Sequence, residues 1–263
     1  MPSGYAAGYS RMAIRVAFVA QLATARRPVN PENSVIVVRG KATSEMTREQ
    51  LEALIAAYDG VTVDLGAGDG RSAYRRAIER PRELVIAIEP VRENVRELSA
   101  KAAKKPERGG APNALYIVAS IEQMPPELRG IAPAGGIADE IFVTLPWGSL
   151  MRGIILGDGG VLGAIASLGR EGAAVRMALN TRIFDDPVPL DVRDLPELTP
   201  EYARDTLAPA FAAAGLRIDE ARWMEAEEVA ALATTWAKRL SHRSPPRSVV
   251  IVATVSEGSG ARC

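Results

Sequence analysis

The chain has 263 residues, 47% of them hydrophobic, with 32 basic and 32 acidic residues. It is long enough to bury one substantial core, and its zero formal net charge means that a polyanionic partner must be met by a local patch of charge. The only cysteine and the only histidine are Cys263 and His242, which argues against a disulfide framework, a Cys/His metal site and the nucleophilic catalysis of most hydrolases.

The amino-terminal segment differs from the rest of the chain. Residues 11–25 are mildly apolar and imitate a signal peptide only faintly, and Arg15 and Gln21 interrupt the run, which is too short to span a membrane. We therefore expect residues 1–34 to be a disordered or loosely packed extension, residues 35–256 to form one domain, and residues 257–263 to be a tail. The scarcity of cysteine and of long apolar segments predicts a cytoplasmic protein.

Beyond this segment the chain alternates strand and helix signals, as is typical of an open α/β sheet. Residues 35–39 and the following KATSE have the pattern of a small hairpin, and apolar residues at helical spacing predict a helix over 46–58. Further strands are predicted at 61–65, 84–88, 115–118, 140–144, 174–179, 216–223 and 248–255. Further helices are predicted at 72–80, 91–103, 201–214 and 226–240.

The most distinctive motif is VDLGAGDG, which ends the strand predicted at 61–65. Its alternate glycines, Gly66, Gly68 and Gly70, let the chain turn sharply into a helix and let a ligand approach the backbone, although a plain turn would also use glycine. A dinucleotide fingerprint or a phosphate loop would need a different spacing. The pattern resembles motif I of class I S-adenosylmethionine-dependent methyltransferases. That resemblance implies S-adenosylmethionine as cofactor and a Rossmann-like, seven-stranded, mostly parallel sheet with a terminal antiparallel pair and helices on both faces.

Residues at the ends of the next strands extend this predicted cofactor site. Glu89 follows a buried strand about 20 residues after the glycines, where such folds place a carboxylate against ribose hydroxyls, although an exposed residue before a proline would look the same. Asp64 either orients the glycine loop or faces the amino-acid part of the cofactor. Ser120 and Glu122 either line its adenine end or cap a helix. The predicted cofactor-binding residues are Asp64, Gly66, Ala67, Gly68, Asp69, Gly70, Glu89, Pro90, Ala119, Ser120, Glu122 and Leu145.

Two tryptophans are candidates for stacking on a planar group. Trp147 lies between a proline and a glycine at a strand end, where it is not packed on all sides and its indole is available to sandwich a nucleobase. Trp236 lies on the helix predicted over 226–240, and its position alone favours the core.

The motifs VDLGAGDG, AIEP, LSAKAAKKPERGG, ASIEQMPP, LPWGSLMRG and TTWAKRL together resemble the aminoglycoside-resistance 16S rRNA methyltransferases of the KamB/NpmA-like family, which modify N1 of the decoding-site adenine 1408. The resemblance covers residues 35–255. It implies an adenine flipped between Trp147 and Trp236, with Pro146 and Ser149 in the same substrate-contacting loop, and so reverses the core interpretation of Trp236. It also implies aminoglycoside resistance, the 30S ribosomal subunit as partner and a monomeric enzyme without a metal.

This chemistry agrees with the scarcity of acid–base residues. Adenine N1 carries a lone pair that can attack the methyl group of a sulfonium directly, so the enzyme mainly positions the reactants. Extruding the base costs on the order of a few kcal/mol, which contacts with the RNA backbone help to offset. Two basic clusters are candidates for those contacts, with a solvated basic face as the alternative. The RNA-binding residues implied by the resemblance are Lys101, Lys104, Lys105, Arg108, Lys238, Arg239 and Arg243.

Three alternatives stay open on the sequence alone. A methyltransferase of the same fold that acts on tRNA or another rRNA site would keep the cofactor residues but lose the tryptophan pair as its target site. A small-molecule methyltransferase would have no use for the basic clusters. A catalytically silent RNA-binding protein would not bind S-adenosylmethionine.

Overall fold

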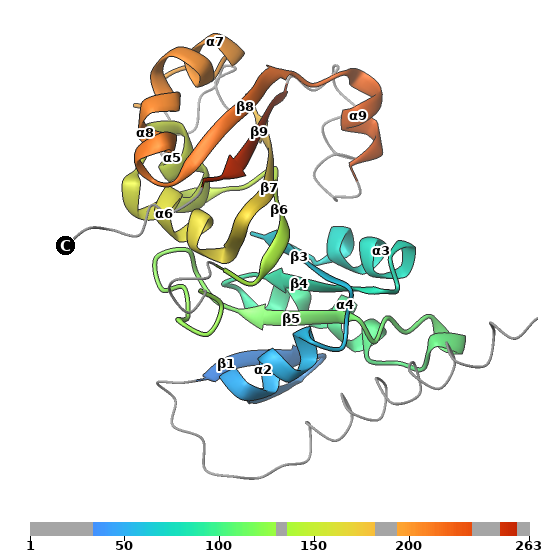
Figure 1. Ribbon diagram of the computed structural model, residues 1–263. Helices are drawn as coiled ribbons and strands as arrows, with labels where there is room; N and C mark the ends of the chain where they lie inside the picture. The colour runs from blue at the N-terminus through green and yellow to red at the C-terminus, as the bar shows by residue number, and fades with distance from the viewer. Residues whose placement is uncertain (1–33, 130–135, 182–193, 233–247, 257–263) are drawn as a thin grey trace, which may run out of the picture.

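The structure is a computed structural model that describes residues 34–129, 136–181, 194–232 and 248–256 (Figure 1). Its strands are β1 (Ser34–Arg39), β2 (Ala42–Thr47), β3 (Gly60–Leu65), β4 (Glu83–Ile88), β5 (Ala114–Val118), β6 (Ala138–Thr144), β7 (Gly169–Asn180), β8 (Leu216–Trp223) and β9 (Ser248–Val255). Its helical segments are α2 (Arg48–Ile55), α3 (Arg71–Glu79), α4 (Arg92–Ala102), η2 (Pro106–Arg108), α5 (Gly148–Leu156), α6 (Gly159–Leu168), α7 (Pro200–Tyr202), the π-helical η4 (Ala203–Leu207), α8 (Ala208–Ala213) and α9 (Ala226–Ala231).

In the described part of the chain, the strands form one sheet in the order β2-β1-β5-β4-β3-β6-β7-β9-β8. Strands β5, β4, β3, β6 and β7 are parallel, and β9 runs antiparallel between β7 and β8. The mostly parallel sheet with a terminal antiparallel pair is therefore confirmed. The sheet is longer than predicted, because β1 and β2 form a hairpin that continues it through antiparallel pairing of β1 with β5.

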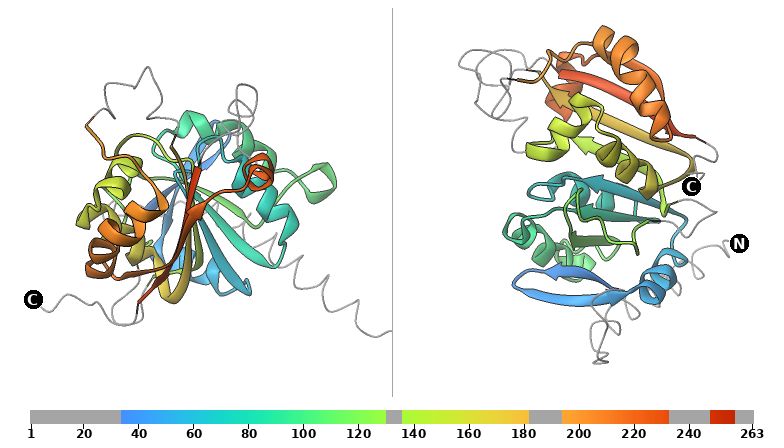
Figure 2. Two further views of the ribbon diagram at one scale, coloured as in Figure 1. Left: turned by 90° about the horizontal axis from the view of Figure 1, so that it is seen from above. Right: turned by 90° about the vertical axis from the view of Figure 1, so that its left-hand side faces the viewer.

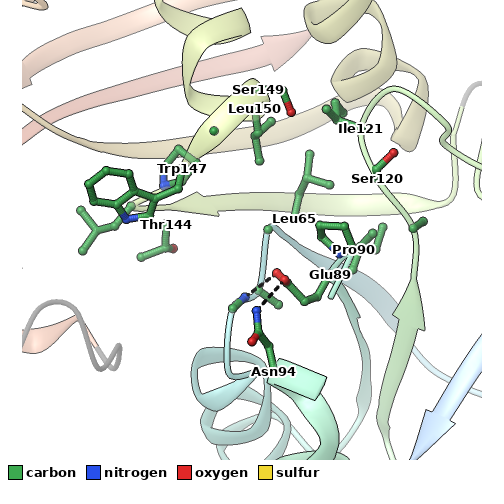
Figure 3. A pocket seen from close by; sticks show the side chains of 18 of the residues that line it. Leu65, Glu89, Pro90, Asn94, Ser120, Ile121, Thr144, Trp147, Ser149 and Leu150 are labelled. Atoms are coloured by element: carbon green, nitrogen blue, oxygen red, sulfur yellow. Dashed lines mark hydrogen bonds between the residues drawn. The ribbon is translucent and has the colours of Figure 1, made fainter. Parts of the chain in front are cut away.

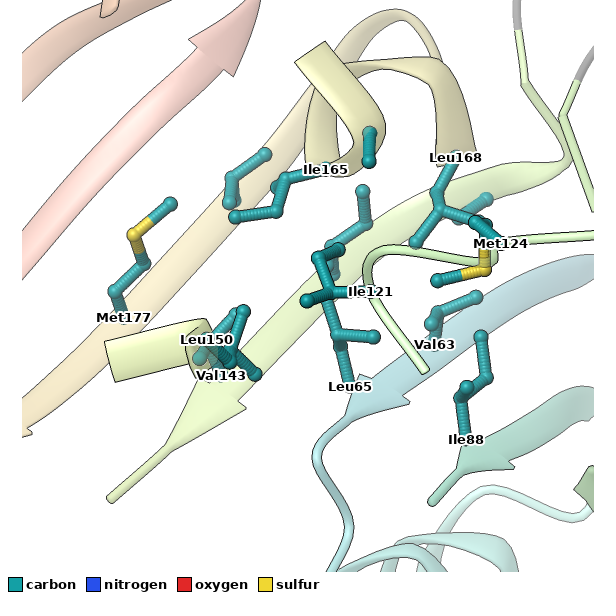
Figure 4. Packing of buried hydrophobic residues seen from close by; sticks show 14 of the residues in the cluster. Val63, Leu65, Ile88, Ile121, Met124, Val143, Leu150, Ile165, Leu168 and Met177 are labelled. Atoms are coloured by element: carbon teal, nitrogen blue, oxygen red, sulfur yellow. The ribbon is translucent and has the colours of Figure 1, made fainter. Parts of the chain in front are cut away.

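Helices cover both faces of the sheet, as predicted (Figure 2). On one face, α3 and α4 pack small and branched side chains such as Ala73 and Val95 against β4 and β5. On the other face, α5 and α6 cover β6 and β7, and α8 packs against β8. Figure 4 shows Leu150 of α5 against Val143 of β6, with Ile165 of α6 in the same buried cluster, the larger of the two.

The start of α2 differs from the prediction. Met46 and Thr47, expected in a helix over 46–58, belong to β2, and the helix begins at Arg48. The reason is a capping box: the Thr47 hydroxyl accepts a hydrogen bond from the backbone N–H of Gln50, and the Gln50 side chain accepts one from the N–H of Thr47. The sequence contains this cap pattern at Thr47 and Gln50, but the apolar spacing of the segment favours a helix that already includes Met46.

Two helices after β6 were not predicted, because glycines punctuate both of them. Gly153 of α5 faces Val161 of α6 so closely that a Cβ atom on Gly153 would lie 2.4 Å from a Val161 methyl carbon. The glycine therefore permits close helix packing instead of marking a loop. No single helix among the described residues is long and apolar enough to cross a membrane; α5 and α6 pass that test only as a pair bent by 105°.

Other predicted segments are confirmed in type, with boundaries that shift by a few residues. The helix predicted over 201–214 consists of α7, η4 and α8 in succession. The helix predicted over 226–240 is described only as α9, because residues 233–247 lie outside the described ranges. The division into residues 1–34, 35–256 and 257–263 stays a prediction, since nearly all of both end segments also lies outside them.

Candidate functional site

A cavity of about 670 Å³ opens at the carboxyl ends of β3, β4, β5 and β6 (Figure 3). This is the edge at which open α/β sheets bind their ligands. The cavity is lined by Leu65, Gly66, Ala67, Gly68, Asp69, Ile88, Glu89, Pro90, Asn94, Ala119, Ser120, Ile121, Glu122, Thr144, Leu145, Pro146, Trp147, Gly148, Ser149 and Leu150.

The glycine loop after β3 forms part of the cavity wall. Gly66, Gly68 and Gly70 have φ angles of 72°, 57° and 74°, a region that other residues rarely adopt. A Cβ atom on Gly68 would meet no protein atom within 4 Å, so this position faces open space. A Cβ atom on Gly70 would lie 2.6 Å from Cε1 of Tyr116. Gly68 thus keeps the cavity clear, whereas Gly70 is required by packing.

Hydrogen bonds hold this loop against the end of β4. The backbone N–H groups of Gly66 and Ala67 both donate to the carbonyl oxygen of Ile88, at 2.9 and 3.0 Å. The N–H of Gly68 donates to Oε2 of Glu89 at 3.0 Å. The loop conformation is therefore fixed by the neighbouring strand.

Glu89 is the most buried of the acidic residues that line the cavity. Its side chain is 6% exposed, and Oε1 accepts hydrogen bonds from the N–H of Val91 at 3.2 Å and from Nδ2 of Asn94 at 2.9 Å. These donors, with Gly68, stabilise a buried carboxylate and fix its direction. Asn94 was not predicted, because nothing in the sequence shows that this polar residue in the first turn of a helix contacts the acidic residue five positions earlier.

Asp64 lies beneath the glycine loop and does not line the cavity. It is 4% exposed, and burial raises its pKa to about 6 despite the nearby Arg76 and hydrogen bonds from the Ser72 side chain and the Ala73 backbone. Its Oδ2 atom has no hydrogen-bond partner in the described structure. These contacts are with the start of α3, a role that neither predicted alternative for Asp64 included.

The loop after β5 contributes Ala119, Ser120 and Glu122 to the cavity. The Ser120 hydroxyl accepts a hydrogen bond from the N–H of Gln123 at 3.3 Å, but this closes a turn and no helix begins there. The pKa of Glu122 is lowered, first of all by a hydrogen bond with the side chain of Ser149. Glu122 and Ser149 therefore connect the loops after β5 and β6.

The loop after β6 carries the strained residue of the site. Leu145 has a φ angle of 49°, in the left-handed region that non-glycine residues avoid at a cost of about 1–3 kcal/mol. Its N–H donates to the carbonyl oxygen of Ala178 on β7 at 2.8 Å. Pro146 and Trp147 follow it at the cavity rim, and the Trp147 side chain is 39% exposed. Strain of this kind is commonly retained at functional sites.

The structure brings together most of the predicted site. All predicted cofactor-binding residues except Asp64 and Gly70 line the cavity, and so do Pro146, Trp147 and Ser149. The apolar residues Leu65, Ile88, Ile121 and Leu150 also line it and were not predicted as site residues. Four predicted residues lie outside the described residues: Trp236, Lys238, Arg239 and Arg243.

The first basic cluster lies at the far end of α4. Lys101, Lys104, Lys105 and Arg108 are all exposed. The helix rises roughly 10 Å from Asn94, which lines the cavity, to Lys101, and the other three residues lie beyond its end. Lys101 is engaged within the protein, because its Nζ lies 4.5 Å from the centre of the Tyr74 ring.

The Tyr74 hydroxyl also fixes the turn that carries this cluster. It donates to the carbonyl oxygen of Gly109 at 2.5 Å. The turn after α4 is thus braced from α3.

In the part of the chain that the structure describes, no group of three or more His, Cys, Asp and Glu residues could hold a metal ion.

Comparison with known proteins gives a consistent result. The family model "NpmA: 16S rRNA (adenine(1408)-N(1))-methyltransferase" matches residues 36–255. A 16S rRNA (adenine(1408)-N(1))-methyltransferase of Streptoalloteichus tenebrarius is 40% identical over 217 residues, which are 82% of this chain and 96% of that protein. The protein of the same description from Escherichia coli is 31% identical over 208 residues, 79% of this chain and 92% of that protein.

Solved structures agree with the sequence relatives. A mutant 16S rRNA (adenine(1408)-N(1))-methyltransferase with cosubstrate SAM from Catenulisporales acidiphilia has a TM-score of 0.79 and 32% identity, covering 86% of this chain and 99% of that one. The 16S rRNA methyltransferase KamB has a TM-score of 0.75 and 38% identity, covering 84% of this chain and 99% of that one.

Proposed function

The chain belongs to the NpmA family of 16S rRNA (adenine(1408)-N(1))-methyltransferases, and from this premise we propose that it methylates N1 of adenine 1408 within the 30S subunit, using a base flipped between two tryptophans. It is an S-adenosylmethionine-dependent enzyme of the class I methyltransferase fold. The observation that carries the finer proposal is the position of Trp147, half-exposed at the rim of a cavity walled by the glycine loop.

The cavity suits S-adenosylmethionine, which supplies an electrophilic methyl group on a positively charged sulfur. Its volume of about 670 Å³ lies in the usual range for ligands of this size, roughly 300–1,000 Å³. The open space above Gly68 admits a ligand close to the backbone, and the fixed carboxylate of Glu89 is an acceptor for ribose hydroxyls. Ala119, Ser120 and Glu122 are positioned to receive the adenine end.

The target adenine is held, in this proposal, by stacking. The exposed face of Trp147 can take up a base at a gain of about 1–3 kcal/mol, and Trp236 supplies the second ring. Base extrusion costs on the order of a few kcal/mol, so two rings and backbone contacts offset it. Adenine N1 needs no general base because its lone pair is available, and none of the residues lining the cavity is a histidine. Pro146 and Ser149 shape the same loop.

Phosphate contacts supply the rest of the RNA affinity. Lys104, Lys105 and Arg108 extend into solvent from the braced turn after α4, where they can meet rRNA phosphates remote from the target base. Lys238, Arg239 and Arg243 would hold the backbone near the flipped nucleotide. The relatives are named for their action on 16S rRNA, and we propose that the substrate is this rRNA within the 30S subunit and that the enzyme acts on it as a monomer.

Aminoglycoside resistance follows from the charge of the product. A methyl group on N1 makes the adenine cationic and blocks its Watson–Crick edge. A polycationic drug that binds the decoding site then meets electrostatic repulsion and a steric obstacle.

The test is to incubate the protein with 30S subunits and labelled S-adenosylmethionine and to map the modification by primer extension. We expect one stop at adenine 1408. Trp147→Ala and Trp236→Ala should keep cofactor binding and lose about tenfold to a hundredfold in methyl-transfer rate. Trp223→Phe, on β8, is the matched control and should retain full activity.

Other outcomes would contradict the proposal. A stop at another nucleotide, or equal methylation of tRNA, would assign a different RNA target. Label incorporated without dependence on added 30S subunits would indicate a small-molecule substrate, and intact folding without cofactor binding would indicate a silent RNA-binding protein.

A further inference from the structure

Asn94 is the third residue of α4, in the first turn of the helix, and its side chain contacts Glu89. Here Nδ2 donates to Oε1 of Glu89 at 2.9 Å, and the helix start at Val91 has no side-chain cap (Figure 3). Asn94 also lines the cavity, so its contact with Glu89 belongs to the ligand site.

The donors around Glu89 occupy most of the sites at which its carboxylate can accept hydrogen bonds. A carboxylate has about four lone-pair sites, two on each oxygen. Oε1 already accepts from the N–H of Val91 at 3.2 Å and from Asn94 at 2.9 Å. Oε2 accepts from the N–H of Gly68 at 3.0 Å. One site remains, and it is on Oε2.

We propose that Asn94 is a positioning residue that determines how Glu89 recognises the ribose of the cofactor. By occupying Oε1, Asn94 restricts Glu89 to one open acceptor site, so a single ribose hydroxyl is bound strongly and the other contributes much less. This inference rests on the proposed function, because the ribose belongs to S-adenosylmethionine. It concerns only the cofactor, so it can be tested without RNA.

The experiment measures binding of S-adenosylhomocysteine and of its 2′-deoxy and 3′-deoxy analogues by calorimetry. For the wild-type protein we expect removal of one hydroxyl to weaken binding about tenfold and removal of the other less than threefold, since a hydrogen bond to a charged group is the stronger kind. In Asn94→Ala, one acceptor site of Oε1 becomes open while the N–H of Val91 keeps the other, so Glu89 has an open site on each oxygen. The two analogues should then differ from each other by less than about twofold, and the parent ligand should bind about fivefold to thirtyfold more weakly.

Two further variants separate positioning from simple structural damage. Asn94→Asp keeps the size of the side chain but replaces the donor by a second carboxylate, and should bind more weakly than Asn94→Ala because like charges repel. Glu97→Ala, on an exposed position of the same helix, is the matched control and should keep the wild-type difference between the analogues. Thermal unfolding of each variant should stay near that of the wild type, because Asn94 does not cap the helix.

Equal penalties for the two deoxy analogues in the wild type would overturn the inference, and so would unchanged binding by Asn94→Ala. Its failure is distinguishable from failure of the proposed function. Methylation of adenine 1408 by a protein that treats both analogues alike would refute the role of Asn94 alone. A protein with the expected difference between the analogues but without activity on 30S subunits would refute the target alone.

Discussion

The side chain of Ser149, in the first turn of α5, forms a hydrogen bond with the carboxylate of Glu122 in the loop after β5. These two residues both line the cavity and are 27 positions apart in the chain. Because an ionised carboxylate only accepts, the hydroxyl must donate, and the contact lowers the pKa of Glu122.

Ser149→Ala should therefore raise the pKa of Glu122 toward its ordinary value and loosen the adenine end of the cavity. We expect S-adenosylhomocysteine affinity to fall about threefold to tenfold, the loss of one hydrogen bond to a charged group in a solvated site. Calorimetry and an NMR titration of the carboxylate measure the two effects. Ser167→Ala, on α6 away from the cavity, is the control, and an unchanged Glu122 pKa in Ser149→Ala would refute the link.

Gly68 and Gly70 should respond differently to the same substitution. Gly70→Ala places a Cβ atom 2.6 Å from the Tyr116 ring, and we expect it to lower the free energy of unfolding by about 2–4 kcal/mol. Gly68→Ala costs only the left-handed strain of about 1–2 kcal/mol, but its methyl group enters the ligand space, so cofactor affinity should fall at least about tenfold. Chemical denaturation of both variants measures the free energy of unfolding, and calorimetry measures cofactor affinity. Equal stability losses with intact binding would contradict the assignment.

The contribution of Asp64 to the free energy of unfolding should increase as pH falls. Its pKa is raised from 3.8 to about 6, so between these values the folded state binds a proton that the unfolded chain lacks. Its contribution is most favourable below about pH 4 and is lost as pH rises through 6. At pH 7.5 the buried charge costs on the order of 2–3 kcal/mol.

Asp64→Asn should accordingly be more stable than wild type at pH 7.5 by about 1–3 kcal/mol and show no advantage at pH 4. Urea denaturation at the two pH values gives the difference directly. A stability difference between wild type and Asp64→Asn that does not change with pH would show that the carboxyl group titrates normally.

The basic turn after α4 should contribute to RNA binding and not to cofactor binding. Lys104→Ala should weaken binding to 30S subunits and reduce the slope of log affinity against log salt by about 1, the effect of one lost phosphate contact. Tyr74→Phe removes the hydroxyl that holds Gly109 and should weaken 30S binding through the shape of the turn without changing that slope. Filter binding over a salt series measures both. Arg217→Ala, on edge strand β8, should behave as wild type.

The sequence predicted β3, β4, β5 and β6, whose carboxyl ends border the cavity, because each contains an apolar run, and β3 and β4 also end at a glycine or an acid. It could not predict α5 and α6, whose glycines resemble loop punctuation. The contact between Gly153 and Val161 and the complete burial of Ile154 and Ile165 stabilise these helices, and Asp158 caps α6 by accepting from the N–H of Val161. Packing against the rest of the core overrides the low helix propensity of their glycines.

The candidate site was predictable to the extent that its residues sit in motifs. Gly66, Gly68 and Glu89 follow from position along the chain, whereas Asn94 is recognisable only once its side chain is seen to contact Glu89. The strain at Leu145 was also invisible, since nothing in the letters TLPW specifies a left-handed residue before proline. The hairpin β1–β2 had a local signature, but its attachment to β5 depends on strand pairing across some 80 residues.

The amide protons of Gly66, Ala67 and Gly68 are all directed at acceptors of β4 and its end. Loops that cradle a diphosphate work in the opposite way, turning successive amides toward the anion. A nicotinamide or flavin dinucleotide would thus find these donors already engaged and would meet a carboxylate beside them. The engaged amides and the Glu89 carboxylate together therefore favour a nucleoside without phosphates.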